Sequence, residues 1–133
     1  MTRDQAQSLL DRIRFLRHPC DFDLIVFFAR HRRALVTSEH ISLFLGYDLK
    51  RIGESLEWLI AENVLTRSQS QSHAARLYVF VGGETAGEWL PPLLDAMSTR
   101  EGRLALRQAM RERLGASARA PIARGFGGMA KTG

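Results

Sequence analysis

The residues from Leu35 to Val81 read LVTSEHISLFLGYDLKRIGESLEWLIAENVLTRSQSQSHAARLYVFV, and this stretch decides the fold. Apolar side chains recur at the spacing of one helix face at Ile41, Phe44 and Leu45. Thr37 precedes this run as a candidate N-cap, and Gly46 follows it as a C-terminal stop. The pattern predicts a short helix between Thr37 and Gly46.

Only Gly46-Tyr47-Asp48 separates this short helix from a longer one. Asp48 is the candidate N-cap of the longer helix, and Asn63 tolerates the left-handed turn that ends it near Glu62. The apolar face consists of Ile52, Leu56, Leu59 and Ile60. The sequence therefore predicts two helices that are joined by a tight turn.

Two β-rich runs, Val64–Arg67 and Arg76–Val81, follow the longer helix. The segment between them, Ser68–Ala75, is polar and turn-prone, and Gly82-Gly83 ends the second run. This arrangement predicts a β-hairpin of two strands.

Two more helices are predicted before this stretch. Arg3–Leu16 has one apolar stripe, and His18-Pro19 ends it because proline disfavours helical geometry in the residue before it. The next helix has Asp21 or Asp23 as its cap and closes at Arg30–Arg33. It is apolar all round, so we expect it at the buried centre of the domain.

The C-terminal part is also predicted to be helical. Thr85–Leu90 favours a short helical turn, and Pro91-Pro92 restarts the chain after it. A capping box of Ser98 and Glu101 opens a helix to about Leu114. The expected fold class is α+β, mainly α. The chain is expected to divide into four parts: an N-terminal helix for packing or dimerisation (residues 1–17), the central domain (21–83), a helical extension (84–114) and a basic, flexible tail (115–133).

Charge and composition restrict the function. The 133 residues carry a net charge of +5, which is compatible with an anionic partner such as nucleic acid. The single cysteine, Cys20, excludes an intramolecular disulfide, and we expect it to be a small packing residue rather than a redox-sensing thiol. The chain has no long apolar run and no signal-peptide pattern, so we expect a cytoplasmic protein with no membrane partner.

We expect neither an enzyme nor a metal or cofactor site. The histidines His18, His31, His40 and His73 are scattered, and none has zinc-site spacing with another or with Cys20. Gly82-Gly83 follows a strand but lacks the other glycines and the lysine of a phosphate-binding loop.

The stretch Leu35–Val81 resembles the winged helix-turn-helix superfamily, which is found in many small bacterial transcriptional regulators. Leu45-Gly46-Tyr47-Asp48 is similar to the turn of that superfamily, and Asn63-Val64-Leu65 is similar to the segment that leaves its third helix. The resemblance implies a three-helix core and a two-stranded β-wing, with extra N- and C-terminal helices. It also implies double-stranded DNA as partner, with the third helix in the major groove and the wing on the phosphate backbone.

The residues that the resemblance assigns to DNA binding are Thr37, Asp48, Leu49, Lys50, Arg51, Glu54, Arg67, Gln69, Gln71, His73 and Arg76. Acidic residues oppose this assignment, because Glu54 and Glu57 are predicted on the exposed side of the third helix. The alternative is a solvated helix face with local ion pairs such as Lys50–Glu54. The outer helices imply a homodimer, and packing onto their own domain is the alternative.

A second function is open at this stage: a winged-helix protein–protein interaction module that does not bind DNA. Leu43, Leu49 and Trp58 occupy positions that are usually polar in the motif, and together they form a possible protein-binding patch. The simpler role for Trp58 is packing under the wing or the N-terminal helix. A regulator gated by a small apolar molecule in a dimer cleft is a third possibility.

Overall fold

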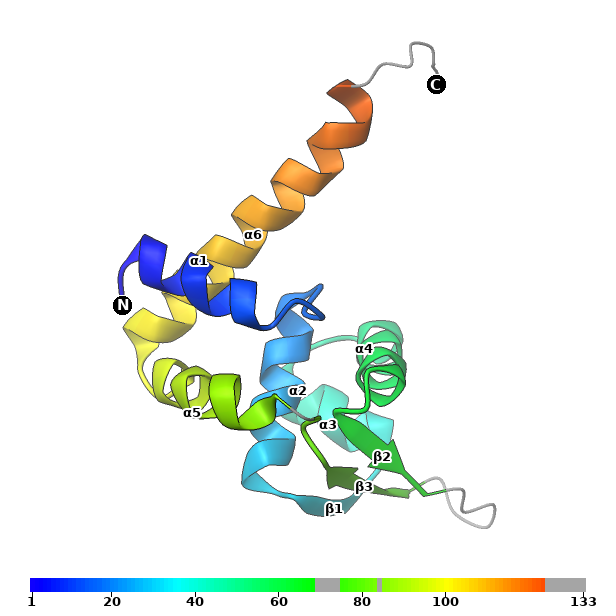
Figure 1. Ribbon diagram of the computed structural model, residues 1–133. Coiled ribbons are helices and arrows are strands. Elements are labelled where there is room, and N and C mark those ends of the chain that lie inside the picture. The colour runs from blue at the N-terminus through cyan, green and yellow to red at the C-terminus, as the bar shows by residue number, and fades with distance from the viewer. Residues whose placement is uncertain (69–74, 84, 124–133) are drawn as a thin grey trace.

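The computed structural model describes residues 1–68, 75–83 and 85–123, with side chains as far as residue 115. The elements are α1 (Arg3–Arg12), α2 (Pro19–Arg30), β1 (Arg33–Val36), α3 (Ser38–Leu45), α4 (Leu49–Ala61), β2 (Leu65–Arg67), β3 (Arg76–Phe80), α5 (Ala86–Met97) and α6 (Arg100–Ala123). The described part of the chain is thus mainly helical with one small antiparallel sheet, which confirms the predicted α+β, mainly α class (Figure 1).

Helix α2 occupies the centre of the molecule, as predicted. In Figure 1 it runs between α1, α5 and α6 on one side and α3, α4 and the sheet on the other. Its side chains are buried on nearly every face: Cys20, Phe22, Leu24, Ile25, Val26, Phe28 and Ala29 all belong to the core. Burial of aromatic and aliphatic side chains of this size supplies most of the favourable free energy of folding.

The sheet has three strands in the order β1-β3-β2, so the expected two-stranded sheet is corrected. The hairpin of β2 and β3 forms as predicted, with Leu65 opposite Phe80. The additional strand, β1, pairs with β3 and places Leu35 opposite Leu77. It has only four residues and begins with an arginine, so its strand conformation depends on pairing with β3 rather than on its own pattern.

The start of α2 differs from the expectation that Asp21 or Asp23 caps it. His18 is the N-cap: its Nδ1 accepts a hydrogen bond from the backbone N–H of Cys20 at 3.0 Å, and Pro19 is the first helical residue. Asp21 lies inside the helix and accepts from the backbone N–H groups of Arg17 and His18. Helix α1 also ends earlier than predicted, at Arg12.

The C-terminal helices differ from prediction at both prolines and at both ends of α6. Pro91 and Pro92 lie inside one continuous helix, α5, because the burial of its neighbours outweighs the backbone hydrogen bonds that proline cannot make. Ser98 ends α5, and the hydroxyl of Thr99 accepts from the backbone N–H of Gly102 at 3.0 Å. Helix α6 continues past Leu114 to Ala123, and residues 124–133 of the predicted tail lie outside the described residues.

Candidate nucleic-acid interface

The turn between α3 and α4 is built from the residues that the sequence indicates. Thr37 caps α3 by accepting from the backbone N–H of His40 at 3.0 Å, and Asp48 caps α4 by accepting from that of Arg51 at 2.7 Å. Gly46 ends α3 in the left-handed region, with φ of 84°. These three local signals hold the two helices close to each other across a three-residue turn.

Helix α4 divides into a buried and an exposed face. Its buried residues are Ile52, Ser55, Leu56 and Leu59. Asp48, Leu49 and Lys50 are exposed at its N-terminal end, and Glu54 and Glu57 are exposed farther along, as the sequence predicted. The outward face of α4 and its N-cap therefore offer one lysine, one leucine, three carboxylates and the first turn of a helix.

Two ion pairs tie arginines to these carboxylates. Arg51 Nη1 lies 3.7 Å from Glu54 Oε1 within α4, and Arg67 Nη1 lies 2.8 Å from Glu57 Oε2, which joins β2 to α4. Burial lowers the pKa of Arg67, but the hydrogen bond and charge of Glu57 outweigh it, and the net shift is upward. Glu54 therefore pairs with Arg51, which lies three residues before it, and not with Lys50 as the sequence suggested.

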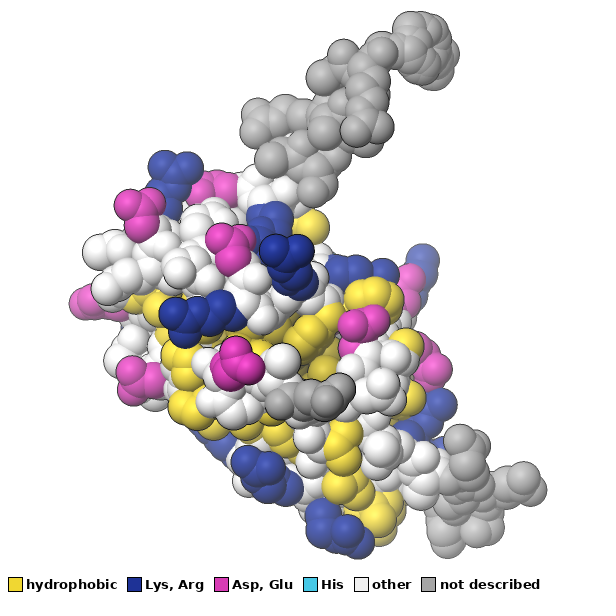
Figure 2. Space-filling view, viewed as in Figure 1, with side chains coloured by type: hydrophobic (Ala, Val, Ile, Leu, Met, Phe, Trp, Pro, Cys, Tyr) yellow, Lys and Arg dark blue, Asp and Glu magenta, His cyan; other side chains and the backbone are white. Residues whose placement is uncertain are grey.

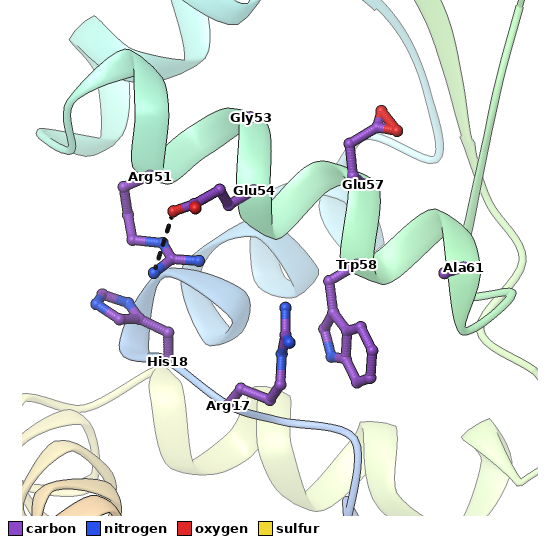
Figure 3. Close-up of a pocket in the computed structure, with 8 residues that line it drawn as sticks. All are labelled: Arg17, His18, Arg51, Gly53, Glu54, Glu57, Trp58 and Ala61. Atoms are coloured by element: carbon purple, nitrogen blue, oxygen red, sulfur yellow. Dashed lines mark ion pairs between the residues drawn. The ribbon is translucent and has the colours of Figure 1, made fainter.

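An open hollow of about 680 Å³ lies along one side of α4, between that helix and the chain ahead of α2 (Figure 3). Arg17 and His18 line it from the N-terminal segment, and Arg51 and Trp58 line it from α4. Burial, and next the charge of Arg51, lower the pKa of His18 below its ordinary value of 6.5. Sequence reasoning missed Arg17 and His18, because no local pattern indicates that they lie beside a helix so far along the chain.

Trp58 is half-buried and is held by two contacts. Its indole N–H donates to the backbone carbonyl of Phe15, and the guanidinium of Arg17 lies over its ring at 3.7 Å from the centroid. This geometry favours the packing interpretation of Trp58, with the segment after α1 as its neighbour.

Arg67 of the hairpin lies beside α4 through its ion pair with Glu57, and Arg76 lies opposite Val36 of β1; both arginines are half-buried. Ser68 starts the connection, and its hydroxyl accepts from the backbone N–H of Leu77 at 3.0 Å. The candidate tip residues Gln69, Gln71 and His73 lie outside the described residues. Figure 2 shows basic and acidic side chains interspersed over the upper and middle parts of this view, whereas the charged side chains seen along its lower edge are basic.

The exposed apolar residues are not quite those expected. Leu43 is 83% exposed and Leu49 is 50% exposed, as a protein-binding patch requires, whereas Trp58 is half-buried. Phe44, which recurs at helical spacing with Ile41 and Leu45, is 71% exposed. Its ring lies 5.5 Å from that of Phe27.

Cys20 lies in the core, where burial raises the pKa of its thiol to about 11. Within the described residues, no three His, Cys, Asp or Glu side chains are grouped as a metal ion would require. None of the helices in that same part of the chain combines the length and hydropathy needed to cross a membrane. In comparisons with known proteins, the chain matches no protein-family model, no curated protein and no solved structure.

Proposed function

We propose that the chain is a DNA-binding transcriptional regulator of the winged helix-turn-helix type. In this proposal α2, α3 and α4 are the three-helix core, and the β2–β3 hairpin is the wing. One observation carries it: α3 and α4 meet across a three-residue turn that leaves the first residues of α4 exposed, and Arg67 of the hairpin is paired with Glu57 farther along α4. A helix pair of this kind presents the N-terminal end of its second helix to the major groove.

The proposal gives each exposed group a role. Lys50 contacts a phosphate or a base edge, and the exposed side chain of Leu49 packs against a thymine methyl group. Arg67 and Arg76 lie toward the phosphate backbone from the hairpin. Arg17 adds a cation from outside the motif, on the side of α4 where the hollow lies.

The carboxylates of α4 are the main feature that lowers the expected affinity for DNA. Glu57 neutralises Arg67 and Glu54 lies close to Arg51, so two of the arginines are already paired in the free protein. On DNA, phosphate oxygens replace these carboxylates as partners of the guanidinium groups. The affinity of the isolated protein for DNA is consequently modest and strongly dependent on salt.

The test is binding to a random-sequence duplex, followed by fluorescence anisotropy at low and near-physiological salt. Lys50→Glu, on the exposed face of α4, is expected to abolish low-salt binding. Arg111→Glu makes the same charge change at an exposed position on α6 and is expected to leave binding nearly intact. Absence of binding by the unmodified protein at low salt, or equal losses in both variants, contradicts the proposal.

A protein–protein interaction module is the second candidate, favoured by the exposure of Leu43 and Leu49 near the turn. Exposed leucines close to each other often mark a binding surface. Leu43→Asp then abolishes capture of a protein partner, whereas Leu104→Asp, at an exposed leucine of α6, does not. Retention of the partner by Leu43→Asp rules out this surface.

We also propose a homodimer, through a smaller surface than the sequence suggested. The apolar stripe of α1, which includes Leu9 and Leu10, is buried within the chain, as are Leu106 and Met110 of α6. Among the described side chains of α6, Leu104 and Leu114 are the exposed large apolar ones, and the proposed contact with a second copy centres on Leu114, toward the end of α6 that projects from the body in Figure 1. Light scattering after size exclusion tests it: Leu114→Glu is expected to give a monomer, and an unmodified protein that is monomeric at high concentration refutes it.

A further inference from the structure

A smaller hollow, of about 210 Å³, lies between α2, α3 and the region where α5 meets α6. Val26 and Met97, which are almost completely buried, and the half-buried Leu45 form its floor. A cavity of roughly 150 Å³ with apolar walls holds a benzene molecule in other proteins. The hollow therefore has room for one aromatic ring with a small polar substituent.

One wall of this hollow is aromatic. The Phe44 ring lies 5.5 Å from that of Phe27, and Phe27 in turn lies 4.9 Å from His31. Phe44 is 71% exposed although it is large and apolar, and it lines the hollow from α3. A flat apolar group bound against the exposed side of Phe44 would remove that ring from water, which is favourable by the hydrophobic effect.

The rim of the hollow is positively charged. Arg30 is exposed at the end of α2, and Arg103 reaches over from α6, where one of its N–H groups donates to the Met97 carbonyl at 3.1 Å. Within the described residues, no carboxylate forms an ion pair with either arginine. Both guanidinium groups are consequently available to an anion.

The one acidic residue in the hollow already has its charge balanced. Asp23 receives a hydrogen bond from the hydroxyl of Tyr47, and Arg107 donates to its two oxygens at 3.1 and 3.2 Å. Asp23 therefore competes weakly for the arginines at the rim. What remains for a ligand is an apolar slot with two cations at its mouth.

We propose that this hollow binds a small organic anion, a carboxylate or sulfonate carried on a single aromatic ring. The ring packs against Phe27 and Phe44, and the anionic group is bound by Arg30 and Arg103 through charge-assisted hydrogen bonds. Such a ligand contacts α2, α3 and α6 at once. The site is independent of the proposed DNA-binding function, because none of the residues assigned to DNA lines it.

Fluorine NMR with 4-fluorobenzoate as the probe tests this site on the full chain. We expect the probe signal to broaden and shift saturably with added protein, and the neutral analogue fluorobenzene to bind at least tenfold more weakly. Phe44→Ser and Arg30→Gln are each expected to weaken binding of the probe at least tenfold, and both replace exposed side chains, so circular dichroism is expected to show an unchanged fold.

Two matched variants on α6 complete the design. Leu104→Ser and Arg111→Gln make comparable changes at exposed positions that do not line the hollow, and they are expected to bind 4-fluorobenzoate as the unmodified protein does. The proposal is overturned if the probe does not bind at millimolar concentration, if all four variants bind equally, or if fluorobenzene binds as well as 4-fluorobenzoate.

Discussion

The guanidinium carbon of Arg17 lies 3.7 Å from the centre of the Trp58 ring, so a residue ahead of α2 is stacked on a residue of α4. The indole N–H of Trp58 donates to the Phe15 carbonyl in the same region. Helix α4 is thus fixed on one side by the N-terminal segment, and on the other by the Glu57–Arg67 pair with β2. Any nucleic acid that α4 contacts meets a helix whose orientation is set before binding.

Loss of the indole is expected to destabilise the fold substantially. Trp58→Ala removes a half-buried ring and leaves the Phe15 carbonyl without its donor, and we expect a loss of about 2–3 kcal/mol in the free energy of unfolding. Arg17→Ala removes only the cation, at a cost of about 0.5–1 kcal/mol. Urea unfolding followed by circular dichroism measures both, with Leu49→Ala on the exposed face of α4 as the control. A Trp58→Ala loss no larger than that of Leu49→Ala contradicts this account.

Two glycines that are seven residues apart are expected to respond in opposite directions. Gly46 has a φ of 84°, so Gly46→Ala is expected to destabilise the protein by about 1 kcal/mol even though no atom blocks the new methyl group. Gly53 lies inside α4 with open space around it, and Gly53→Ala is expected to stabilise by about 0.5–1 kcal/mol. The melting temperatures of the two variants test this expectation. Changes of the same sign in the two melting temperatures would show that the turn does not require glycine.

Local signals made much of the helix-turn-helix region predictable. The caps Thr37 and Asp48, the stop at Gly46 and the left-handed Asn63 each act within a few residues, and the sequence predicts each of them. The predicted cap of α2, Asp21 or Asp23, is wrong because histidine is seldom an N-cap, whereas aspartate is a common one.

The features that sequence reasoning missed depend on distant parts of the chain. Strand β1 exists only through its pairing with β3, and α5 tolerates Pro91 and Pro92 because the core holds Trp89 and Leu93. The approach of Arg17 to Trp58 is of the same kind. Periodicity reports which face of an element is apolar, and it does not report which element covers that face.

The thiol of Cys20 is expected to be inert while the protein is folded. Burial raises its pKa to about 11, so at pH 8 almost none of it is thiolate, and its exposed fraction is 0%. Ellman's reagent is expected to react with it at the rate of global unfolding, and at once in 6 M guanidinium chloride. Fast reaction of the Cys20 thiol under native conditions would contradict its packing role and favour a redox-sensing role.

The stability of the protein is expected to fall on mild acidification because of His18. Burial, and next the charge of Arg51, lower the pKa of His18 in the folded state. As the pH falls below 6.5, the unfolded state therefore takes up the proton first, and the free energy of unfolding decreases until the pH reaches the folded-state pKa. Protonation also removes the Nδ1 acceptor that caps α2.

His18→Asn is the matched variant for this effect, because asparagine is a good N-cap that does not titrate. Urea midpoints measured at pH 7.5 and pH 5 are expected to differ less in His18→Asn than in the unmodified protein. If the two proteins lose the same stability between these pH values, another group is responsible for the pH dependence.

Glu57 gives the sharpest test of whether α4 contacts DNA. Glu57→Gln removes a negative charge from the exposed face of α4 while an amide oxygen remains to accept from Arg67. A unit charge about 4 Å from a phosphate contributes about 1 kcal/mol even in water, so we expect low-salt affinity to rise about fivefold. Glu88→Gln makes the same charge change at an exposed position on α5 and is expected to alter affinity less than twofold.

The pair of variants separates contact from net charge. If both raise the affinity equally, the protein attracts DNA only through its overall charge, and α4 is not at the interface. A rise confined to Glu57→Gln places the exposed face of α4 against the phosphates. The rise should then shrink as salt increases, because screening weakens a charge–phosphate repulsion at this distance, whereas a change in folding stability would persist at high salt.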